Sequence, residues 1–541
     1  MKHKEALVGI PLLVTLALVA GIWIGYSFIP SDSRSGHPEA KVGEILDIIS
    51  ENYVDQVDLD SLIEITIPSM LENLDPHTAY IPAADLDEVN ADLEGSFSGI
   101  GISFQVMNDT ITVVEIISGG PSEKVGLMAG DRIVEVNDST VAGTDITPDQ
   151  VRALLRGAAG TQVKLGVMRN TSPDMLTYTV TRGDIPVTSI DASYMIEDRI
   201  GYIKVNKFGR NTYEEFYTEM LMLDRAGAKD IILDLRGNGG GFLDVAIRMA
   251  NEFLNRDNLI VMTKGRDGEL LFAAKSDGSG SFRNDRVVIL IDEFSASASE
   301  IMAGAIQDND RGIIIGRRSF GKGLVQQQIN LADSSAMRVT TARYYTPSGR
   351  CIQKPWEKGH NDRYATEIYE RYLAGEAFSA DSVKFDDSML FSTTTGRSVY
   401  GGGGIMPDIF VPSDTTNYTQ YLTSVVNAGL LHRFAFEYTD RNRGKLDAAT
   451  NSDELLRILP PDQELLSQFV AYAASNGVPA RWYYINLSRP LLVNQLKALI
   501  ARDALGVAAY YEIVNHRDNM VRRALEAIRS GEAEWPVKPK A

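Results

Sequence analysis

Residues 200 to 345 alternate between apolar strands and amphipathic helices, and this alternation constrains the fold more than any other feature of the sequence. Strands are expected at Ile200–Val205, Asp230–Leu235, Val287–Ile291, Gly312–Ile315, Gly323–Ile329 and Met337–Tyr345, and helices at Thr212–Arg225, Gly241–Phe253 and Ser297–Gln307. Such a pattern predicts a layered α/β domain in which helices cover a sheet. Ligands of these folds bind at the carboxyl ends of the strands, so the loops 236–241 and 292–297 are candidate site loops.

The whole chain is longer than one such domain. Its 541 residues, of which 44% are hydrophobic and 23% charged, predict several globular domains and not a disordered chain. The 53 Lys and Arg residues against 72 Asp and Glu residues give a net charge of -19, which repels phosphate backbones and argues against nucleic acid as a partner. A single cysteine, Cys351, and six histidines without metal-ligand spacing predict no metal site, and we expect no cofactor.

The amino terminus carries the features of a membrane anchor. A short basic end is followed by the uncharged, mostly apolar run Ala6–Ile29, which is long enough to span a hydrocarbon core of about 30 Å. A cleaved signal peptide is the alternative, but the run exceeds a signal-peptide core and no Ala-x-Ala cleavage site follows it. We expect residues 1–30 to be a cytoplasmic stub and a transmembrane anchor, with the rest of the chain at the periplasmic face of a bacterial inner membrane.

Composition divides the remaining chain into four segments, so the expected fold class is multidomain. Residues 31–94 are expected to form a linker and a small helical module, and residues 95–183 a β-rich domain. Residues 184–412 are the α/β domain with an insertion at about 354–400, and residues 413–541 a helical C-terminal domain. The apolar stripes of the two helical segments favour docking or a homodimer through these modules.

The β-rich segment resembles a PDZ domain. The resemblance is carried by the turn Gly99-Ile100-Gly101-Ile102, the segments 120–127 and 130–133, and a helix expected at Pro148–Arg156. The turn alone also fits an ordinary tight turn, and it is the combination that favours a PDZ domain. The resemblance implies that the backbone N–H groups of this turn bind the C-terminal carboxylate of a protein, whose tail adds a strand to the domain.

Three loops of the α/β segment resemble those of the C-terminal processing peptidases, also called tail-specific proteases. The motifs are Asp-Leu-Arg-Gly-Asn-Gly-Gly-Gly at 234–241, Phe-Ser-Ala-Ser-Ala-Ser-Glu-Ile at 294–301 and Ser-Phe-Gly-Lys-Gly at 319–323. This resemblance, which covers about residues 48–412, implies a serine peptidase with Ser297 as nucleophile, Lys322 as general base and Gln326 completing the site. It also implies an oxyanion hole made by the backbone N–H groups of Gly241 and Ala298.

The same residues fit this chemistry on physical grounds. No histidine occurs between His77 and His360, so a Ser-His-Asp triad has no base within the α/β segment. A lysine is a useful base at neutral pH only when burial lowers its pKa, and Lys322 has apolar neighbours in the sequence. The four-residue step to Gln326 places both side chains on one face, where the amide oxygen can accept a hydrogen bond from the amine.

Each motif also has a plainer interpretation. Ser297 with Glu300 fits a helix capping box, which is compatible with a nucleophile because the start of a helix stabilises negative charge. The glycine run 239–241 fits a flexible turn as well as a loop whose N–H groups approach a substrate. Glu300, Asp308 and Arg236 are expected to give structural support.

Three alternative functions have weaker support in the sequence. Residues 316–322 fit the Gly-x-x-x-x-Gly-Lys of a P-loop, but Gly323 stands where magnesium binding needs Ser or Thr. Residues 319–322 fit the Ser-x-x-Lys of penicillin-recognising enzymes, but the flanking glycines disfavour the required helix. A non-catalytic PDZ scaffold with a degenerate peptidase fold is the third, and the intact Ser297 and Lys322 argue against it.

These patterns predict a membrane-anchored, extracytoplasmic serine endopeptidase. Its substrates are expected to be proteins with apolar C-terminal tails, which the PDZ groove captures and the pair Ser297 and Lys322 cleaves nearby. The family resemblance also suggests that Arg156, at the end of the groove helix, couples the two domains by reaching the peptidase domain once a tail binds. A solvated charge at a helix end is the simpler interpretation of Arg156.

Overall fold

The computed structural model describes residues 38–117, 119–170 and 172–534, and the predicted anchor at residues 1–30 lies outside them. Among the described residues, no helix is both long and apolar enough to cross a membrane. The described chain forms two compact units that divide between Asn73 and Leu74.

The first unit contains the helices α2 (Pro38–Asn52) and α3 (Leu59–Leu71). The side chain of Asp58 begins α3 by accepting hydrogen bonds from the N–H groups of Asp60 and Ser61. Apolar side chains on these helices stay exposed, among them Ile45 at 47% and Ile65 at 73%.

The second unit begins with a segment that the sequence pattern described incorrectly. Residues 31–94 were expected to form only a linker and a helical module, but Ala79–Ile81 form the strand β1, and only then does α4 (Leu86–Glu94) begin. β1 pairs antiparallel with β18 (Ala336–Tyr345). A strand of three residues whose partner lies far along the chain has too short a pattern to be recognised from local periodicity.

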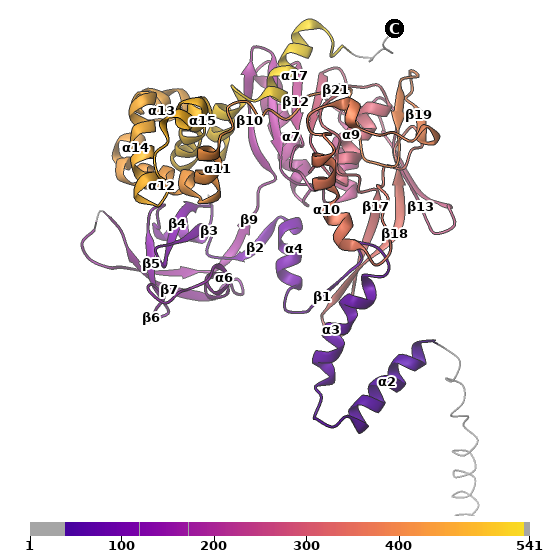
Figure 1. Ribbon diagram of the computed structural model, residues 1–541, viewed down its shortest axis with the longest axis horizontal. Coiled ribbons are helices and arrows are strands. Elements are labelled where there is room, and N and C mark those ends of the chain that lie inside the picture. Colours follow the sequence, from indigo (N-terminus) through magenta and orange to yellow (C-terminus); the bar gives the residue numbers. More distant parts are fainter. Residues whose placement is uncertain (1–37, 118, 171, 535–541) are drawn as a thin grey trace, which may run out of the picture. The chain divides into compact units, whose positions relative to one another are not determined.

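The second unit contains a six-stranded sheet in the order β10-β11-β12-β15-β16-β21. Figure 1 labels β10, β12 and β21 of this sheet. β10 runs antiparallel to its neighbour and the other strands run parallel. The strand bounds are β10 (Ile190–Glu197), β11 (Ile200–Val205), β12 (Asp230–Asp234), β15 (Arg286–Ile291), β16 (Ile313–Gly316) and β21 (Ile409–Phe410). The expected layered α/β core is therefore present.

Helices cover both faces of this sheet because its strands are apolar on both sides. Ile231 and Leu233 of β12 pack into a core with α7 (Thr212–Arg225), α8 (Leu243–Asn251) and α9 (Ala298–Asp308). Ile232, between them, packs on the opposite face with α17 (Asn519–Ser530).

The helix α17 departs from the expected domain organisation. The whole of residues 413–541 was assigned to one helical domain, whereas Met520, Val521 and Leu525 of α17 are buried against the six-stranded sheet. The remaining helices share a core of their own, which includes Phe434, Phe469 and Leu496. They are α11 (Gln420–Asn427), α12 (Leu430–Leu446), α13 (Ser452–Ile458), α14 (Asp462–Ser475), α15 (Trp482–Leu505) and α16 (Val507–Asn515).

A second sheet lies beside the candidate site loops. It contains β1, β18, β13 (Leu259–Lys264) and β14 (Leu270–Lys275) in that order, and β17 (Leu324–Asn330) also pairs with β18. The insertion that follows contains α10 (Asn361–Leu373), the 3₁₀ turns η1 (Ala380–Ser382) and η2 (Asp387–Met389), and the hairpin of β19 (Leu390–Ser392) and β20 (Ser398–Tyr400).

The β-rich segment folds as a sheet in the order β3-β4-β5-β7-β8, with β6 paired to β5. Its elements are β3 (Ile102–Met107), β4 (Thr110–Ile116), α5 (Pro121–Val125), β5 (Arg132–Val136), β6 (Ser139–Thr140), α6 (Pro148–Leu155), β7 (Gln162–Met168) and β8 (Leu176–Thr181). Only one helix was expected, so the short α5 is an addition. A separate ladder of β2 (Ser96–Gly99) and β9 (Gly183–Pro186) joins the two ends of this segment.

Candidate active site

Three motif loops meet at one edge of the central sheet. The loop 235–242 follows β12, the loop 292–297 follows β15, and the loop 317–323 follows β16. These three strands are neighbours in the sheet and run parallel, so their carboxyl ends lie side by side. The three loops therefore lie at the carboxyl ends of the strands, as the sequence pattern predicted, and this is the edge where α/β folds bind their ligands.

Ser297 precedes the first residue of α9 in a strained backbone conformation. Its φ of 55° and ψ of -114° are rarely adopted by a residue that has a side chain. Such strain persists only where the surrounding structure enforces it, and it is concentrated at functional sites. The backbone at Ser297 is enforced by its N–H, which donates to Glu300 Oε2 at 2.9 Å.

Glu300 connects the serine loop to the lysine loop. Its carboxylate accepts hydrogen bonds from Ser297 N, Lys322 N, Gly321 N and the Ser319 hydroxyl, at 2.5 to 2.9 Å. Ser297 and Lys322 share one oxygen of this carboxylate, Oε2. Glu300 is fully buried, and burial raises its pKa while the four donors oppose that rise. The sequence indicated only a support role for Glu300, and only through the capping-box spacing.

The amine of Lys322 is held in a largely buried position. Lys322 lies in the loop before β17, and Gln326 lies on that strand. Lys322 Nζ donates a hydrogen bond to Gln326 Oε1 at 3.0 Å. Burial, followed by the charge of Arg338, lowers the pKa of Lys322, whereas Glu300 and Asp75 raise it. The Tyr344 hydroxyl donates to the carbonyl oxygens of Ser297 and Lys322, at 3.1 and 2.7 Å.

The glycine loop packs directly against the serine. A side chain at Gly240, whose φ is 102°, would place its Cβ 2.7 Å from Ser297 Cβ and 2.9 Å from Ala298 N. A side chain at Gly241 would overlap the carbonyl oxygen of Phe208. The N–H groups of Gly241 and Ala298 therefore have no acceptor within the part of the chain that the structure describes.

Asn238 fixes the position of this glycine loop, and sequence reasoning did not single it out. Its side chain donates to Val205 O at 3.0 Å and accepts from Gly240 N at 2.8 Å. Its backbone carbonyl oxygen accepts hydrogen bonds from Ala296 N and from the Ser299 hydroxyl. The only signal for this role in the sequence is that the asparagine stands between two glycines.

The insertion supports the lysine loop from outside. Arg371 of α10 donates to the carbonyl oxygens of Arg318 and Ser319, at 2.8 and 3.0 Å. The ring of Tyr364, also on α10, meets the ring of Phe320 edge-on at 5.8 Å. The expected insertion is therefore packed against the site and is not an independent appendage.

The competing motifs do not have the structures that their chemistry requires. Residues 319–322 lie in a loop that continues into β17, whereas Ser-x-x-Lys needs a helix. The Ser319 hydroxyl is buried, donates to Glu300 and accepts from Ile405 N at 2.7 Å. A P-loop needs a helix after its lysine, and a strand stands there instead. Within the described residues no cluster of His, Cys, Asp or Glu is arranged to hold a metal ion.

The predicted tail-binding turn belongs to a different module from the residues above. Gly101 adopts a φ of 78°, and a side chain there would crowd Ile185, Gly120 and Pro121. The chain then continues into β3, an edge strand that pairs only with β4 in its sheet. Gly99 lies in the ladder with β9, while Ile100 and Ile102 lie on either side of Gly101.

Arg156 contacts the segment before the PDZ domain and not the α/β core. Its guanidinium lies 3.4 Å from Glu88 Oε1 of α4 and 5.3 Å from the centre of the Phe97 ring. Arg152, one turn earlier on α6, lies 3.9 Å from the same carboxylate oxygen.

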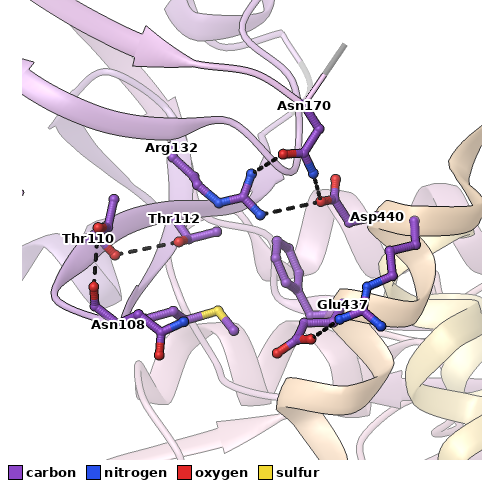
Figure 2. A pocket seen from close by; sticks show the side chains of 10 residues that line it. Asn108, Thr110, Thr112, Arg132, Asn170, Glu437 and Asp440 are labelled. Atoms are coloured by element: carbon purple, nitrogen blue, oxygen red, sulfur yellow. Dashed lines mark hydrogen bonds and ion pairs between the residues drawn. The ribbon is translucent and has the colours of Figure 1, made fainter. Parts of the chain in front are cut away.

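A second surface of the PDZ module is joined to the helical region by Asp440 of α12. Figure 2 shows Arg132, Asn170 and Asp440 pointing toward one another. Asn170 Nδ2 donates to Asp440 Oδ2 at 2.6 Å, and Arg132 Nη2 lies 3.5 Å from the same oxygen. Asp440 also lies so close to Gly130 that no side chain fits there. The contact borders a cavity of about 260 Å³.

Family models match three segments of the chain. The model of peptidase family S41 matches residues 199–359, that of the PDZ domain residues 98–180, and that of a family of unknown function residues 421–506. The carboxy-terminal-processing protease of Bartonella bacilliformis is 35% identical over 62% of this chain and 79% of its own length. A probable CtpA-like serine protease of Staphylococcus haemolyticus is 32% identical over 81% of this chain and 86% of its own.

Among solved structures, the photosystem II D1 C-terminal processing protease is 25% identical and covers 70% of this chain and 88% of its own, with a TM-score of 0.37. The sequence relatives settle the family, because they match most of their own length at more than 30% identity. The resemblance noted in the three motif loops and in the PDZ turn is thereby confirmed, and the chain belongs to peptidase family S41 as a carboxy-terminal-processing serine protease with an embedded PDZ domain.

Proposed function

We propose that this chain hydrolyses peptide bonds of protein substrates with Ser297 as nucleophile and Lys322 as general base. The observation that carries the proposal is the shared Glu300 carboxylate, which binds the backbone N–H groups of both residues. Glu300 holds the backbones of the two residues, and Gln326 accepts a hydrogen bond from the amine, which supports a base positioned before a substrate arrives.

The reaction follows from these positions. Neutral Lys322 takes the proton of the Ser297 hydroxyl as its oxygen attacks the scissile carbonyl carbon. The N–H groups of Gly241 and Ala298 stabilise the negative oxygen of the tetrahedral intermediate. The Lys322 ammonium then protonates the leaving amine, and water activated by the regenerated amine hydrolyses the acyl-enzyme. Burial supports this role, because it lowers the pKa of Lys322 toward the range of a usable base.

The PDZ module is proposed to select the substrate by its C-terminal tail. The exposed edge of β3 can take an added peptide strand, and the turn Gly99–Ile102 before it can bind the terminal carboxylate. Ile102, the first residue of β3, is apolar and only partly buried, which supports apolar residues in a tail added beside this strand.

Membrane anchoring and extracytoplasmic action are proposed from the sequence alone, and dimer formation from the sequence and from exposed side chains. Residues 1–30 supply the anchor, and the part after them would act at the periplasmic face. The exposed apolar side chains of α2 and α3, such as Val42 and Ile65, support a homodimer through this helical module. Membrane retention after high-salt and carbonate washing tests the anchor, and a soluble chain beginning between Gly25 and Ser35 would contradict it.

The function is tested with polypeptides that differ only in their last three residues. The full chain is expected to cleave substrates with apolar ends faster than those with charged ends, and Ser297→Ala is expected to bind the same tails without cleaving them. A chain that binds tails but cleaves nothing would instead be a PDZ scaffold with a degenerate peptidase fold.

A further inference from the structure

The amide of Gln326 has a second partner besides Lys322. Its Oε1 accepts from Lys322 Nζ at 3.0 Å, and its Nε2 donates to the backbone carbonyl oxygen of His77. His77 lies far upstream in the sequence, in the turn 75–78 between α3 and β1. The side chain that orients the amine is therefore itself oriented by a distant segment.

This second bond decides which way the amide points. A carbonyl oxygen only accepts hydrogen bonds, so the amide end that faces His77 must be the NH₂ group. A reversed amide would place two oxygens against each other and would present NH₂ to the amine of Lys322. The His77 carbonyl thus directs the oxygen of Gln326 to the lysine.

The turn itself is held by the carboxylate of Asp75. Its Oδ1 accepts from His77 N and Thr78 N, both at 2.9 Å, and its Oδ2 accepts from the Thr78 hydroxyl at 2.6 Å. The Thr340 hydroxyl of β18 donates to Asp75 Oδ1 at 3.1 Å. Asp75 is 8% exposed, so these bonds form largely out of water.

Strand pairing brings the turn to Gln326. Thr340 lies directly opposite Gln326 in the ladder of β17 and β18. β1, which follows the turn, pairs with β18 from Arg338 to Ala336. Asp75 therefore joins the turn to the residue that faces Gln326.

We propose that the turn 75–78 belongs to the catalytic centre, and that Asp75 is a positioning residue that acts on Lys322 through Gln326. The proposal rests on the proposed function of Lys322 as general base. His77 takes part through its carbonyl oxygen, while its ring Nε2 pairs with the Tyr364 hydroxyl at 3.0 Å.

The charge of Asp75 gives this role a second consequence. The charged and titratable groups around the Lys322 amine are Glu300, Arg338, Asp75 and His77. Burial first, and then the charge of Lys322, lowers the pKa of His77 to about 4, so His77 is uncharged at neutral pH. Asp75 is negative there and raises the pKa of Lys322, whereas Arg338 lowers it. Removing the Asp75 charge must therefore lower the pKa of Lys322.

The first test is a double-mutant cycle in the full chain, with kcat measured on a peptide that has no PDZ-binding tail. Asp75→Ala and Gln326→Ala are each expected to lower kcat by about 10- to 100-fold. If Asp75 acts through Gln326, the double variant is no slower than Gln326→Ala. If the fold losses of kcat in the two single variants multiply in the double variant, the proposal is wrong.

The second test uses Asp75→Asn, which keeps an oxygen to accept from His77 N and Thr78 N. The rise of its rate with pH is expected to occur at a pH lower by at least ~0.3 unit, because a Lys322 with a lower pKa loses its proton at lower pH. Asp58→Asn is the matched control, since Asp58 accepts the same kinds of bonds at the start of α3, and its profile should stay in place. An unmoved Asp75→Asn profile would contradict the proposal even if Asp75→Ala does not fold.

Failure of the two proposals can be told apart. If Lys322→Ala keeps its activity, the proposed general base is wrong and this inference falls with it. If Lys322→Ala is inactive while the losses in Asp75→Ala and Gln326→Ala multiply, the base stands and only the role of Asp75 is wrong.

Discussion

The catalytic centre and the PDZ module hold their charged side chains in opposite ways. Glu300, at the centre, is fully buried and accepts four hydrogen bonds. Arg156, at the end of the PDZ helix, is 35% exposed and meets a Glu88 side chain that is 59% exposed. A bond lost from a buried carboxylate costs about 1–3 kcal/mol, whereas an exposed ion pair contributes about 0–1 kcal/mol. The catalytic groups are therefore held by buried hydrogen bonds before a substrate binds. The charged side chains of the PDZ module make exposed contacts, which a ligand can replace at little cost.

The largest effect is expected at the dyad. Ser297→Ala and Lys322→Ala should each lower kcat by about 10⁴-fold or more, and the double variant should be no worse than either, because nucleophile and base act as one unit. Lys322→Arg should be as inactive as Lys322→Ala, since a guanidinium does not give up its proton at usable pH. Steady-state cleavage of an unfolded protein measures all four variants.

Neighbouring serines serve as matched controls for that prediction. Ser295→Ala, Ser299→Ala and Ser319→Ala should all retain measurable cleavage, because their hydroxyls bind the carbonyl of Leu235, the carbonyl of Asn238 and the carboxylate of Glu300. If Ser319→Ala were as inactive as Ser297→Ala, and Ser297→Ala still formed a covalent adduct with a serine-directed inhibitor, the nucleophile would be Ser319.

The next largest effect is expected at Glu300. Glu300→Gln keeps the shape of the side chain but turns an NH₂ group toward donors that need an acceptor, so the loops of Ser297 and Lys322 lose their shared anchor. We expect kcat to fall by roughly 100-fold while tail binding to the PDZ module stays unchanged. Cleavage kinetics and peptide titration give the two readouts, and a loss of both would indicate general unfolding.

The two regions also differ in how far sequence reasoning could describe them. The assignment of Ser297, Lys322 and Gln326 was implied by the resemblance of short motifs to a known family, and the strands and helices around these motifs leave local signals in the sequence. α7 lies at its expected residues, Thr212–Arg225, for the same reason. Asp75 and His77 could not be placed this way, since only the pairing of β1 with β18 brings them to Gln326.

Tertiary packing accounts for the other differences. α17 has the periodicity of any amphipathic helix, and nothing in that pattern says that its apolar face covers the central sheet and not the helical domain. Asp440 is one of many acidic residues on a helix surface, and its role appears only when Asn170 and Arg132 are placed against it. Asn238 likewise becomes distinctive only through its partners in two other loops.

An intermediate effect is expected where the PDZ module meets α12. Asp440→Ala removes the partner of Asn170 and Arg132, and we expect the free energy of unfolding to fall by about 1–2 kcal/mol. Amide hydrogen exchange should increase in β5 and β7 while cleavage of a tail-free peptide keeps its rate. Faster exchange in β17, at the dyad, would show that the two regions are not separate in the way proposed.

The smallest effect is expected at Arg156. If Arg156 couples the domains, Arg156→Ala should lower kcat for substrates with apolar tails by about 3- to 10-fold and leave tail affinity intact. Glu88→Ala is the control, because it breaks the same exposed pair but leaves the guanidinium free to move. If Arg156→Ala and the unmodified chain have equal turnover, Arg156 does not couple the domains and is only a solvated charge at the end of a helix.

The central claim, that Lys322 is the base for Ser297, is tested most directly by the pH dependence of acylation. A small serine-directed inhibitor without a tail bypasses the PDZ module, and mass spectrometry of the modified peptide gives the rate at Ser297. We expect this rate to rise with pH along one ionisation well below the value of ~10.4 for a free lysine, since burial lowers the pKa of Lys322. That ionisation should disappear in Lys322→Ala. Acylation of Ser297 in Lys322→Ala at the unmodified rate, with the same pH dependence, would contradict the account.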